Sequence, residues 1–127
     1  YKVGGLCSGV GGIELGFRQS GFEVSWANDM DKNAMITYES IMVRNHYIGG
    51  QAMKLEDIIT NKSLSPLLTQ VDVLAAGFPC QAFSVAGYRK GFNDERVNVF
   101  FKICDIIRFL KNNRGAPKVL LLENYIV

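Results

Sequence analysis

The stretch that decides the fold lies at residues 71–81, which read VDVLAAGFPCQ. The mainly apolar run at 71–76 has the length and composition expected of a buried strand. Cys80 follows it closely, so the sequence places a thiol at the carboxyl end of that strand. Because open α/β sheets bind their ligands at the carboxyl ends of the strands, this position is suited to chemistry.

Cys80 is the candidate nucleophile of this chain. A cysteine attacks as the thiolate, and a sheet rim with backbone donors and nearby cations favours that form. Pro79 fixes its own backbone angle and restricts Phe78, so the turn that we expect there presents Cys80 in one direction. An isolated cysteine is more often a small buried apolar residue. The residues around Cys80 favour the nucleophile.

Predicted strands and helices alternate along the rest of the chain. We expect strands at residues 2–7, 22–27, 71–76 and 118–122, and helices at residues 11–19, 32–44 and 94–112. Residues 47–59 read as a short edge strand and a turn, residues 64–69 as a helical turn, and residues 82–93 as a mobile loop. This order predicts an α/β fold with a doubly wound, mainly parallel sheet and right-handed crossovers.

Length and composition indicate one domain over residues 1–127, because 127 residues of which 48% are hydrophobic form one core of ordinary size. No apolar run approaches the roughly 20 residues that span a bilayer, and no signal peptide is visible, so we expect a cytoplasmic protein without a membrane segment. Cys7, Cys80 and Cys104 lack metal-type spacing, so no metal site or disulfide is expected. His46 is the only histidine and has no recognisable catalytic partner.

The charge of the chain is unevenly divided. Residues 1–76 carry six Lys and Arg against eight Asp and Glu, whereas residues 77–127 carry eight against four. The positive excess therefore lies with Cys80 and the residues that follow it. Such a surface suits a polyanion such as nucleic acid, although a solvated charged face is the simpler interpretation.

The first predicted strand runs into a glycine-rich turn, and residues 6–14 read LCSGVGGIE. Glycines let a backbone approach a ligand closely, and free N–H groups at a helix start favour a carboxylate or phosphate, so the turn suits a nucleotide-type ligand. At the end of the second strand, Asp29 is the candidate ligand for ribose hydroxyls. We interpret Asp31 as the cap of the next helix.

Glu123 places a carboxylate at the end of the last predicted strand. Burial at an apolar rim would suit this group to donate or share a proton. The alternative is an ordinary acid that caps a loop. Together with Cys80, Glu123 suggests covalent attack combined with proton transfer.

These motifs, in this order, resemble those of the cytosine-5 methyltransferases over nearly the whole chain. Residues 8–12 (SGVGG) are similar to the family's S-adenosylmethionine motif, residues 77–84 (GFPCQAFS) to its catalytic motif, and residues 123–124 to its ENV motif. The resemblance implies the Rossmann-like fold of S-adenosylmethionine-dependent methyltransferases, truncated after about five strands. It also implies S-adenosyl-L-methionine as cofactor and double-stranded DNA as substrate.

The resemblance further assigns roles to residues. Cys80 would attack carbon 6 of a cytosine flipped out of the duplex, and Glu123 would hydrogen-bond or protonate ring nitrogen 3. Carbon 5 would then accept the methyl group, lose its proton, and release Cys80. The implied catalytic set is Cys80, Glu123, Pro79 and Asn124. The implied cofactor set is Cys7, Ser8, Gly9, Val10, Gly11, Gly12, Asp29, Met30, Asp57, Ile58, Gly77 and Val99, with Asp57 and Ile58 at the adenine edge. The implied DNA-contact loop includes Gln81, Ser84, Arg89, Lys90 and Arg96.

Several positions depart from the family's pattern. Cys7 and Met30 stand where aromatic residues are usual, Gly5 stands where an acid is frequent, and residues 96–99 read RVNV in place of RGTL. These departures predict weak cofactor binding. The sequence also ends before the family's target-recognition domain, so we expect a missing C-terminal part, supplied in cis or as a second subunit.

Two other functions stay open at this point. An RNA cytosine-5 methyltransferase would use related chemistry, although Phe78 stands where that branch usually has proline. A noncatalytic, cofactor-binding subunit of a split methyltransferase is suggested by Cys7, Met30 and Val97.

Overall fold

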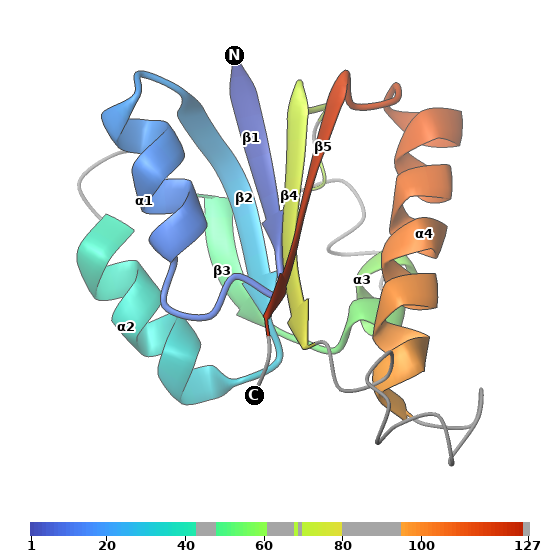
Figure 1. The fold of residues 1–127 in the computed structure, drawn as a ribbon, viewed down its shortest axis with the longest axis horizontal. Helices are drawn as coiled ribbons and strands as arrows, with labels where there is room; N and C mark the ends of the chain where they lie inside the picture. The colour runs from blue at the N-terminus through green and yellow to red at the C-terminus, as the bar shows by residue number, and fades with distance from the viewer. Residues whose placement is uncertain (43–47, 61–67, 69, 80–94, 126–127) are drawn as a thin grey trace.

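A computed structural model of the chain describes residues 1–42, 48–60, 68, 70–79 and 95–125. Nine elements follow one another along the chain (Figure 1). They are β1 (Lys2–Leu6), α1 (Gly12–Gln19), β2 (Glu23–Asp29), α2 (Lys32–Met42), β3 (Ile48–Ala52), α3 (Leu55–Thr60), β4 (Val73–Pro79), α4 (Glu95–Asn113) and β5 (Val119–Tyr125).

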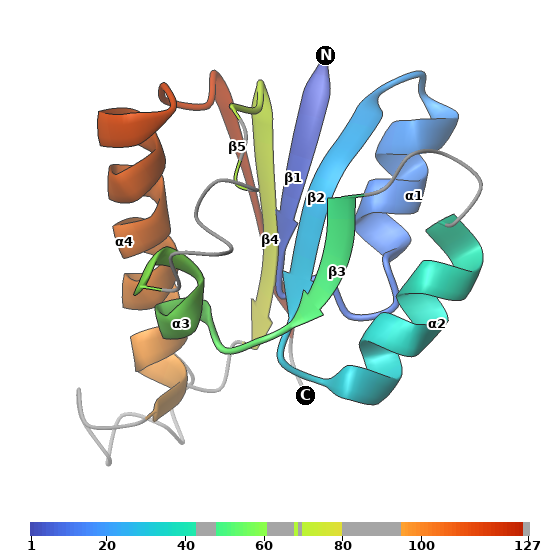
Figure 2. The same ribbon diagram turned by 180° about the vertical axis from the view of Figure 1, so that it is seen from behind.

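The strands form one parallel sheet in the order β3-β2-β1-β4-β5. Helices α1 and α2 cover one face of this sheet, and α3 and α4 cover the other (Figures 1 and 2). This arrangement confirms the predicted doubly wound, parallel α/β sheet. Because β1 and β4 are neighbours, the chain winds outward from them in opposite directions, first through β2 and β3 and later to β5.

Three predicted details are corrected by the structure. β4 continues to Pro79 and β5 to Tyr125, so residues 77–79 belong to a strand and not to a turn. The pairing of Gly77 with Glu123 continues to the pair Pro79 and Tyr125, and a proline is tolerated there because it ends the strand. Residues 55–60 form α3, where a turn was expected. The predicted turn at 64–69, except Leu68, and the predicted loop at 82–93 lie outside the described residues.

Helices α3 and α4 pack against the sheet through apolar side chains. On α4, Ile103, Ile106 and Leu110 recur at helical spacing and are buried against the β4 side of the sheet. On α3, Leu55 and Ile58 lie in the same core. None of the described helices combines the length and the apolar character needed to cross a membrane.

The cap of α2 confirms the predicted role of Asp31. Its Oδ1 atom accepts hydrogen bonds from the backbone N–H groups of Asn33 at 2.8 Å and Ala34 at 3.3 Å. These are among the donors that a helix start leaves without partners inside the helix. The cap also fixes where the chain turns after β2, and so helps to position Asp29.

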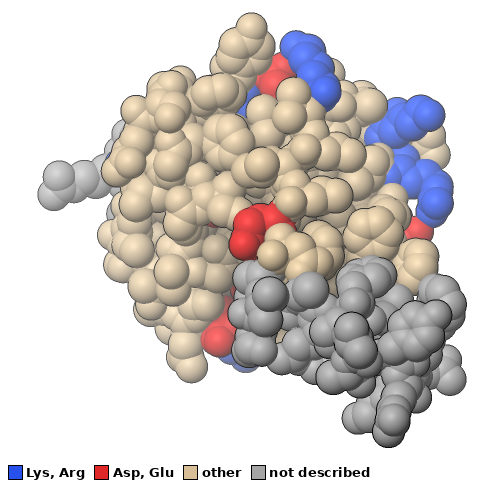
Figure 3. Space-filling model, in the orientation of Figure 1, with Lys and Arg blue, Asp and Glu red and all other residues tan. Residues whose placement is uncertain are grey.

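The β5 edge of the sheet is apolar and exposed. Between 40% and 54% of the residue surface stays accessible at four consecutive positions, Val119, Leu120, Leu121 and Leu122. Figure 3, in which this edge faces the viewer, shows few charged side chains over the described part of the face. A long apolar edge strand is suited to pairing with further protein.

We expect Ile106→Ala to lower the free energy of unfolding by about 2–5 kcal/mol, because it leaves a cavity under α4. The matched control is Ile36→Ala, which removes the same atoms from a side chain that is 66% exposed on α2. That control should change stability by less than about 0.5 kcal/mol. Urea denaturation of both variants measures the difference, and equal losses would contradict the packing described for α4.

Candidate active site

The turn between β1 and α1 has an unusual backbone. Cys7, Gly9 and Gly11 have φ angles of 52°, 54° and 91°, all in the left-handed region. A side chain at residue 11 is also excluded by packing, since a Cβ atom there would lie 2.7 Å from the ring of Tyr38. Glycine meets these demands without strain, whereas Cys7 adopts its conformation at a cost in free energy.

Asp29 ties this turn to the end of β2. The Gly9 N–H donates to Asp29 Oδ2 at 2.8 Å, and the Asp31 N–H donates to Asp29 Oδ1 at 2.9 Å. Each carboxylate oxygen keeps a further lone pair. The acid predicted to bind ribose hydroxyls is therefore held in place by the glycine-rich turn and still has acceptor capacity.

A cavity of about 420 Å³ opens beside Asp29, between the ends of β1 and β2 and helices α3 and α4. This volume is in the range of small-molecule sites. The lining residues are Cys7, Asn28, Asp29, Met30, Met53, Lys54, Leu55, Glu56, Val99 and Lys102. Among the described residues, no group of three or more His, Cys, Asp and Glu side chains is placed to hold a metal ion.

Four predicted cofactor residues, Cys7, Asp29, Met30 and Val99, lie along this cavity. Of the others, Ser8, Gly9, Val10, Gly11 and Gly12 form the adjacent turn and the start of α1, and Gly77 lies in β4. The structure does not place Asp57 or Ile58 along the cavity: Ile58 is buried in the core, and Asp57 is exposed.

Sequence reasoning missed the residues that line the cavity from the α3 side. Met53 and Lys54 directly follow β3, and the Asn28 amide donates to the Met53 carbonyl at 2.8 Å. Lys102 of α4 forms an ion pair with Glu56 at 3.0 Å. Residues just after a strand of a parallel sheet lie at the ligand-binding edge, so the position of Met53 and Lys54 was the available signal.

The Cys7 thiol is not a nucleophile in this environment. Burial raises the pKa of Cys7 from 9.0 to about 12, and the negative charge of Asp29 acts in the same direction. The group therefore stays protonated at neutral pH. It offers the cavity a neutral, polarisable surface.

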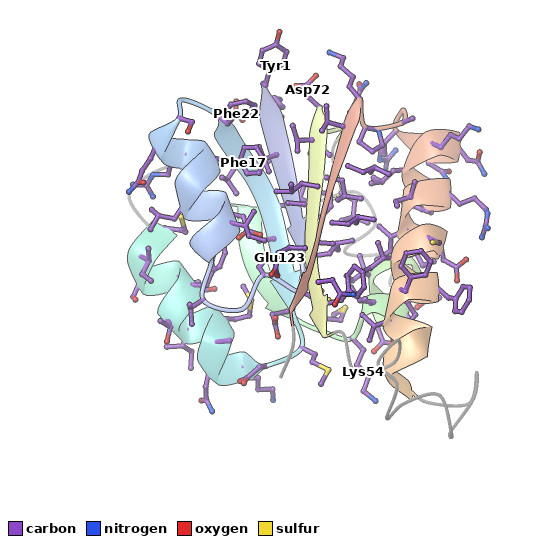
Figure 4. The ribbon with its side chains drawn as sticks, viewed as in Figure 1. Tyr1, Phe17, Phe22, Lys54, Asp72 and Glu123 are labelled. Carbon is purple, nitrogen blue, oxygen red and sulfur yellow. The ribbon has the colours of Figure 1, made fainter. Side chains whose placement is uncertain are left out.

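Glu123 of β5 pairs with Gly77 of β4, one residue beyond the level at which β1 ends. A Cβ atom on Gly77 would lie 3.4 Å from Glu123 Oε2 and 3.7 Å from the carbonyl oxygen of Cys7. Figure 4 shows Glu123 near the carboxyl ends of the central strands. The side chain is exposed, so the burial expected from the sequence is absent. Asn124, the next residue on β5, is also exposed.

The remaining predicted site residues cannot be placed in the same detail. Pro79 is the last residue of β4, and Cys80 is the next residue along the chain. Cys80, Gln81, Ser84, Arg89 and Lys90, together with the side chains of Pro79 and Arg96, lie outside the described part of the chain.

Glu14 is a buried polar group that sequence reasoning did not single out. Its side chain is 1% exposed, and its Oε1 atom accepts a hydrogen bond from Ser8 Oγ at 2.6 Å. No simple pattern predicts this, because an acid in the first turn of an amphipathic helix usually faces solvent.

The family model that matches this chain is one of DNA methylases, and the proteins similar to it include type II methyltransferases. Residues 1–125 match the family model of the C-5 cytosine-specific DNA methylases. The type II methyltransferase M.Bsp6I of Bacillus sp. (strain RFL6) is 44% identical over 97% of this chain and 35% of its own length. M.HhaI of Haemophilus parahaemolyticus is 37% identical over 94% of this chain and 32% of its own.

Solved structures agree in fold. A prophage-encoded DNA modification methyltransferase of E. coli superposes with a TM-score of 0.71 at 26% identity, over 97% of this chain and 31% of its own. The Dnmt2 methyltransferase of S. pombe superposes with a TM-score of 0.68 at 22% identity, over 97% of this chain and 35% of its own. This chain thus spans about a third of the length of M.Bsp6I and M.HhaI.

We expect Cys7 in the folded chain to react with iodoacetamide at pH 9 roughly a hundredfold more slowly than in the urea-unfolded chain, because only the thiolate reacts. Peptide mapping by mass spectrometry measures both rates on the same residue. The thiol of the unfolded chain loses its proton around pH 9.0, whereas that of the folded chain keeps it up to a pH of about 12. The contribution of this group to the free energy of unfolding is therefore lost as the pH rises from 9.0 to about 12. Equal rates in the two states would refute the buried thiol.

Proposed function

Because the chain belongs to the C-5 cytosine-specific DNA methylase family, we propose that it is the cofactor-binding and catalytic part of a DNA cytosine-5 methyltransferase. One observation carries the proposal. The parallel pairing of β1, β4 and β5 brings the Glu123 carboxylate and the Cys7 carbonyl against Gly77, three residues before Cys80. The proposed acid and the proposed cofactor turn thus meet at the edge of the sheet where β4, the strand that precedes Cys80 in the chain, ends.

The described residues fit S-adenosyl-L-methionine, which when bound would supply an electrophilic methyl group on a sulfonium. Asp29 would accept hydrogen bonds from the ribose hydroxyls, since both of its oxygens keep acceptor capacity. Cys7, Met30, Met53 and Val99 would provide apolar contacts for the adenine. Met53 and Lys54 line the cavity, and they therefore replace Asp57 and Ile58 as the α3-side contacts in this proposal.

The chemistry would begin with Cys80, whose sulfur bonds to carbon 6 of a cytosine turned out of the duplex. A stacked base does not admit a thiol, so flipping precedes attack. Glu123 would hold a proton at ring nitrogen 3, which draws electron density away from the ring and allows carbon 6 to be attacked. After carbon 5 is methylated it gives its proton to solvent, and the electron pair of that bond forms the double bond between carbons 5 and 6. The bond from Cys80 to carbon 6 then breaks with its electrons on sulfur, which regenerates the thiolate, and the proton at ring nitrogen 3 returns to Glu123. Because Glu123 is exposed, its carboxyl group is accessible to a flipped cytosine.

DNA recognition would depend on more polypeptide than these 127 residues. M.Bsp6I and M.HhaI are about three times as long as the matched part. The apolar edge of β5 is suited to pairing with that remaining part. Residues 81–96 would contact DNA phosphates, which position a protein without specifying a base. The DNA-specific family description favours this function over RNA methylation, and the type II relatives suggest a restriction-modification role.

The first test is covalent trapping. In the presence of the remaining polypeptide and S-adenosylmethionine, we expect a duplex rich in 5-fluorocytosine to form a denaturation-resistant adduct, because fluorine cannot leave carbon 5 as a cation. Gel electrophoresis measures the adduct. Cys80→Ser should abolish it while reversible DNA binding persists, and Cys104→Ser should retain it. An equally intense band from Cys80→Ser would refute the assigned nucleophile.

The second test concerns the cofactor. Met30 is 73% exposed beside the cavity, and Met30→Trp should tighten binding of S-adenosylhomocysteine about fivefold by adding an aromatic contact. Isothermal calorimetry measures the affinity. Ile36→Trp adds the same ring to an exposed site on α2 and should have no effect. If Met30→Trp leaves the affinity unchanged, the adenine does not lie against residue 30.

A further inference from the structure

Glu14 presents a carboxyl group to the sheet in place of an apolar side chain. It is 1% exposed, and the strand residue beneath it is Gly5. In the neighbouring strands, Gly5 pairs with Ala27 and Ala75, so the three central strands carry only small side chains at this level. Burial of a carboxyl group costs free energy unless it forms good hydrogen bonds, and its presence here therefore calls for a reason.

Gly5 and Glu14 compete for the same space. A Cβ atom on Gly5 would overlap Glu14 Oε1 and would lie 2.6 Å from Ser8 Oγ. Any side chain at residue 5 would therefore displace the Glu14 carboxyl group from Ser8. The Glu14 carboxyl group therefore occupies the space that a side chain at residue 5 would fill.

The Glu14 carboxyl group holds Ser8 from the α1 side. Ser8 Oγ donates to Glu14 Oε1 at 2.6 Å, while the next residue, Gly9, donates its N–H to Asp29 on the opposite side. Cys7, which precedes Ser8, is in the left-handed conformation. The turn is thus fastened at two consecutive residues by two acids from different elements.

We propose that Glu14 is a positioning residue, which through Ser8 holds the turn at residues 8–11 in the conformation that binds the cofactor, and that it acts as a neutral hydrogen-bond acceptor. The cofactor part of this inference rests on the proposed function. The position of the turn itself does not.

The surroundings of Glu14 favour the neutral form. Burial raises the pKa of the Glu14 carboxyl group against the opposing hydrogen bonds from Ser8 and from the backbone of Glu14 itself, and the negative charge of Asp29 adds to the rise. Within the described residues, Glu14 Oε2 is buried without a hydrogen-bond partner, which would be costly for an anion. An uncharged amide should therefore replace this carboxyl group, because its oxygen also accepts from Ser8.

The experiment compares Glu14→Gln and Glu14→Leu in the 127-residue chain. Amide hydrogen exchange of Gly9 and Gly11 in the ligand-free chain reports the turn, because their N–H groups donate to Asp29 and to the Ser8 carbonyl. Calorimetry with S-adenosylhomocysteine reports binding, and thermal melting reports global stability. Glu14→Gln should match the parent in all three.

Glu14→Leu fills the same volume without an acceptor. It should melt at or above the parent temperature, yet exchange the two glycine amides faster and bind S-adenosylhomocysteine about fivefold to tenfold more weakly. A merely structural role for Glu14 would lower the melting temperature and leave these local measurements unchanged.

A second pair of variants tests the shared space. Glu14→Ala should loosen the turn, because it removes the acceptor of the Ser8 hydroxyl. Gly5→Asp should destabilise the chain, because both side chains then claim one space.

Parent-like exchange in Glu14→Leu would overturn the positioning role. Behaviour of Glu14→Gln like that of Glu14→Leu would overturn the neutral acceptor. Absence of S-adenosylhomocysteine binding by the parent chain would count against the proposed cofactor, and hence against the cofactor part of this inference, while the exchange measurements would still decide whether Glu14 positions the turn.

Discussion

The parallel pairing of β1 with β4 is the constraint on which the rest of the structure depends. The register runs from Val3 with Val73 to Leu6 with Ala76, so both strands end at the same level. From these two neighbours the chain winds outward in opposite directions, and the carboxyl ends of such a pair of strands are where open α/β sheets bind their ligands. The turn after β1 and the last residues of β4 therefore lie close together, although they are distant in sequence: a Cβ atom on Gly77 would lie 3.7 Å from the Cys7 carbonyl oxygen.

Small residues in β1 and β4, which form the seam of the sheet, serve both packing and the site. Gly4 leaves room for the ring of Trp26 on the α4 side, and Gly5 leaves room for Glu14 on the α1 side. Gly77 lies beside Glu123 and the Cys7 carbonyl, at distances that would leave a Cβ atom in ordinary van der Waals contact. The seam also contains costly features, namely a buried carboxyl group and a left-handed Cys7. Such strain persists where the surrounding structure holds it, and it gathers here next to the candidate site.

Asp29 dominates the electrostatics of the turn. It accepts hydrogen bonds from two backbone N–H groups, and its charge adds to the effect of burial, which is the main cause of the raised pKa of both Cys7 and Glu14. The raised pKa values favour the protonated form of both groups, which reduces the number of like charges in a poorly solvated region. Across the cavity, Glu56 pairs with Lys102. The Asp29 carboxylate, which keeps acceptor capacity, suits a ligand that presents hydroxyl donors.

The sequence by itself determined the features that depend on near neighbours in the chain. Alternating apolar patterns predicted most strands and helices, the glycines marked the turn after β1, and Asp31 was recognised as a cap because capping is local. Only the tertiary structure decided that Met53 and Lys54 line the cavity, that Glu123 is exposed and that Glu14 is buried. These outcomes depend on which strands pair and which helix covers them. Burial and pairing are set by contacts between distant segments, and no local pattern contains that information.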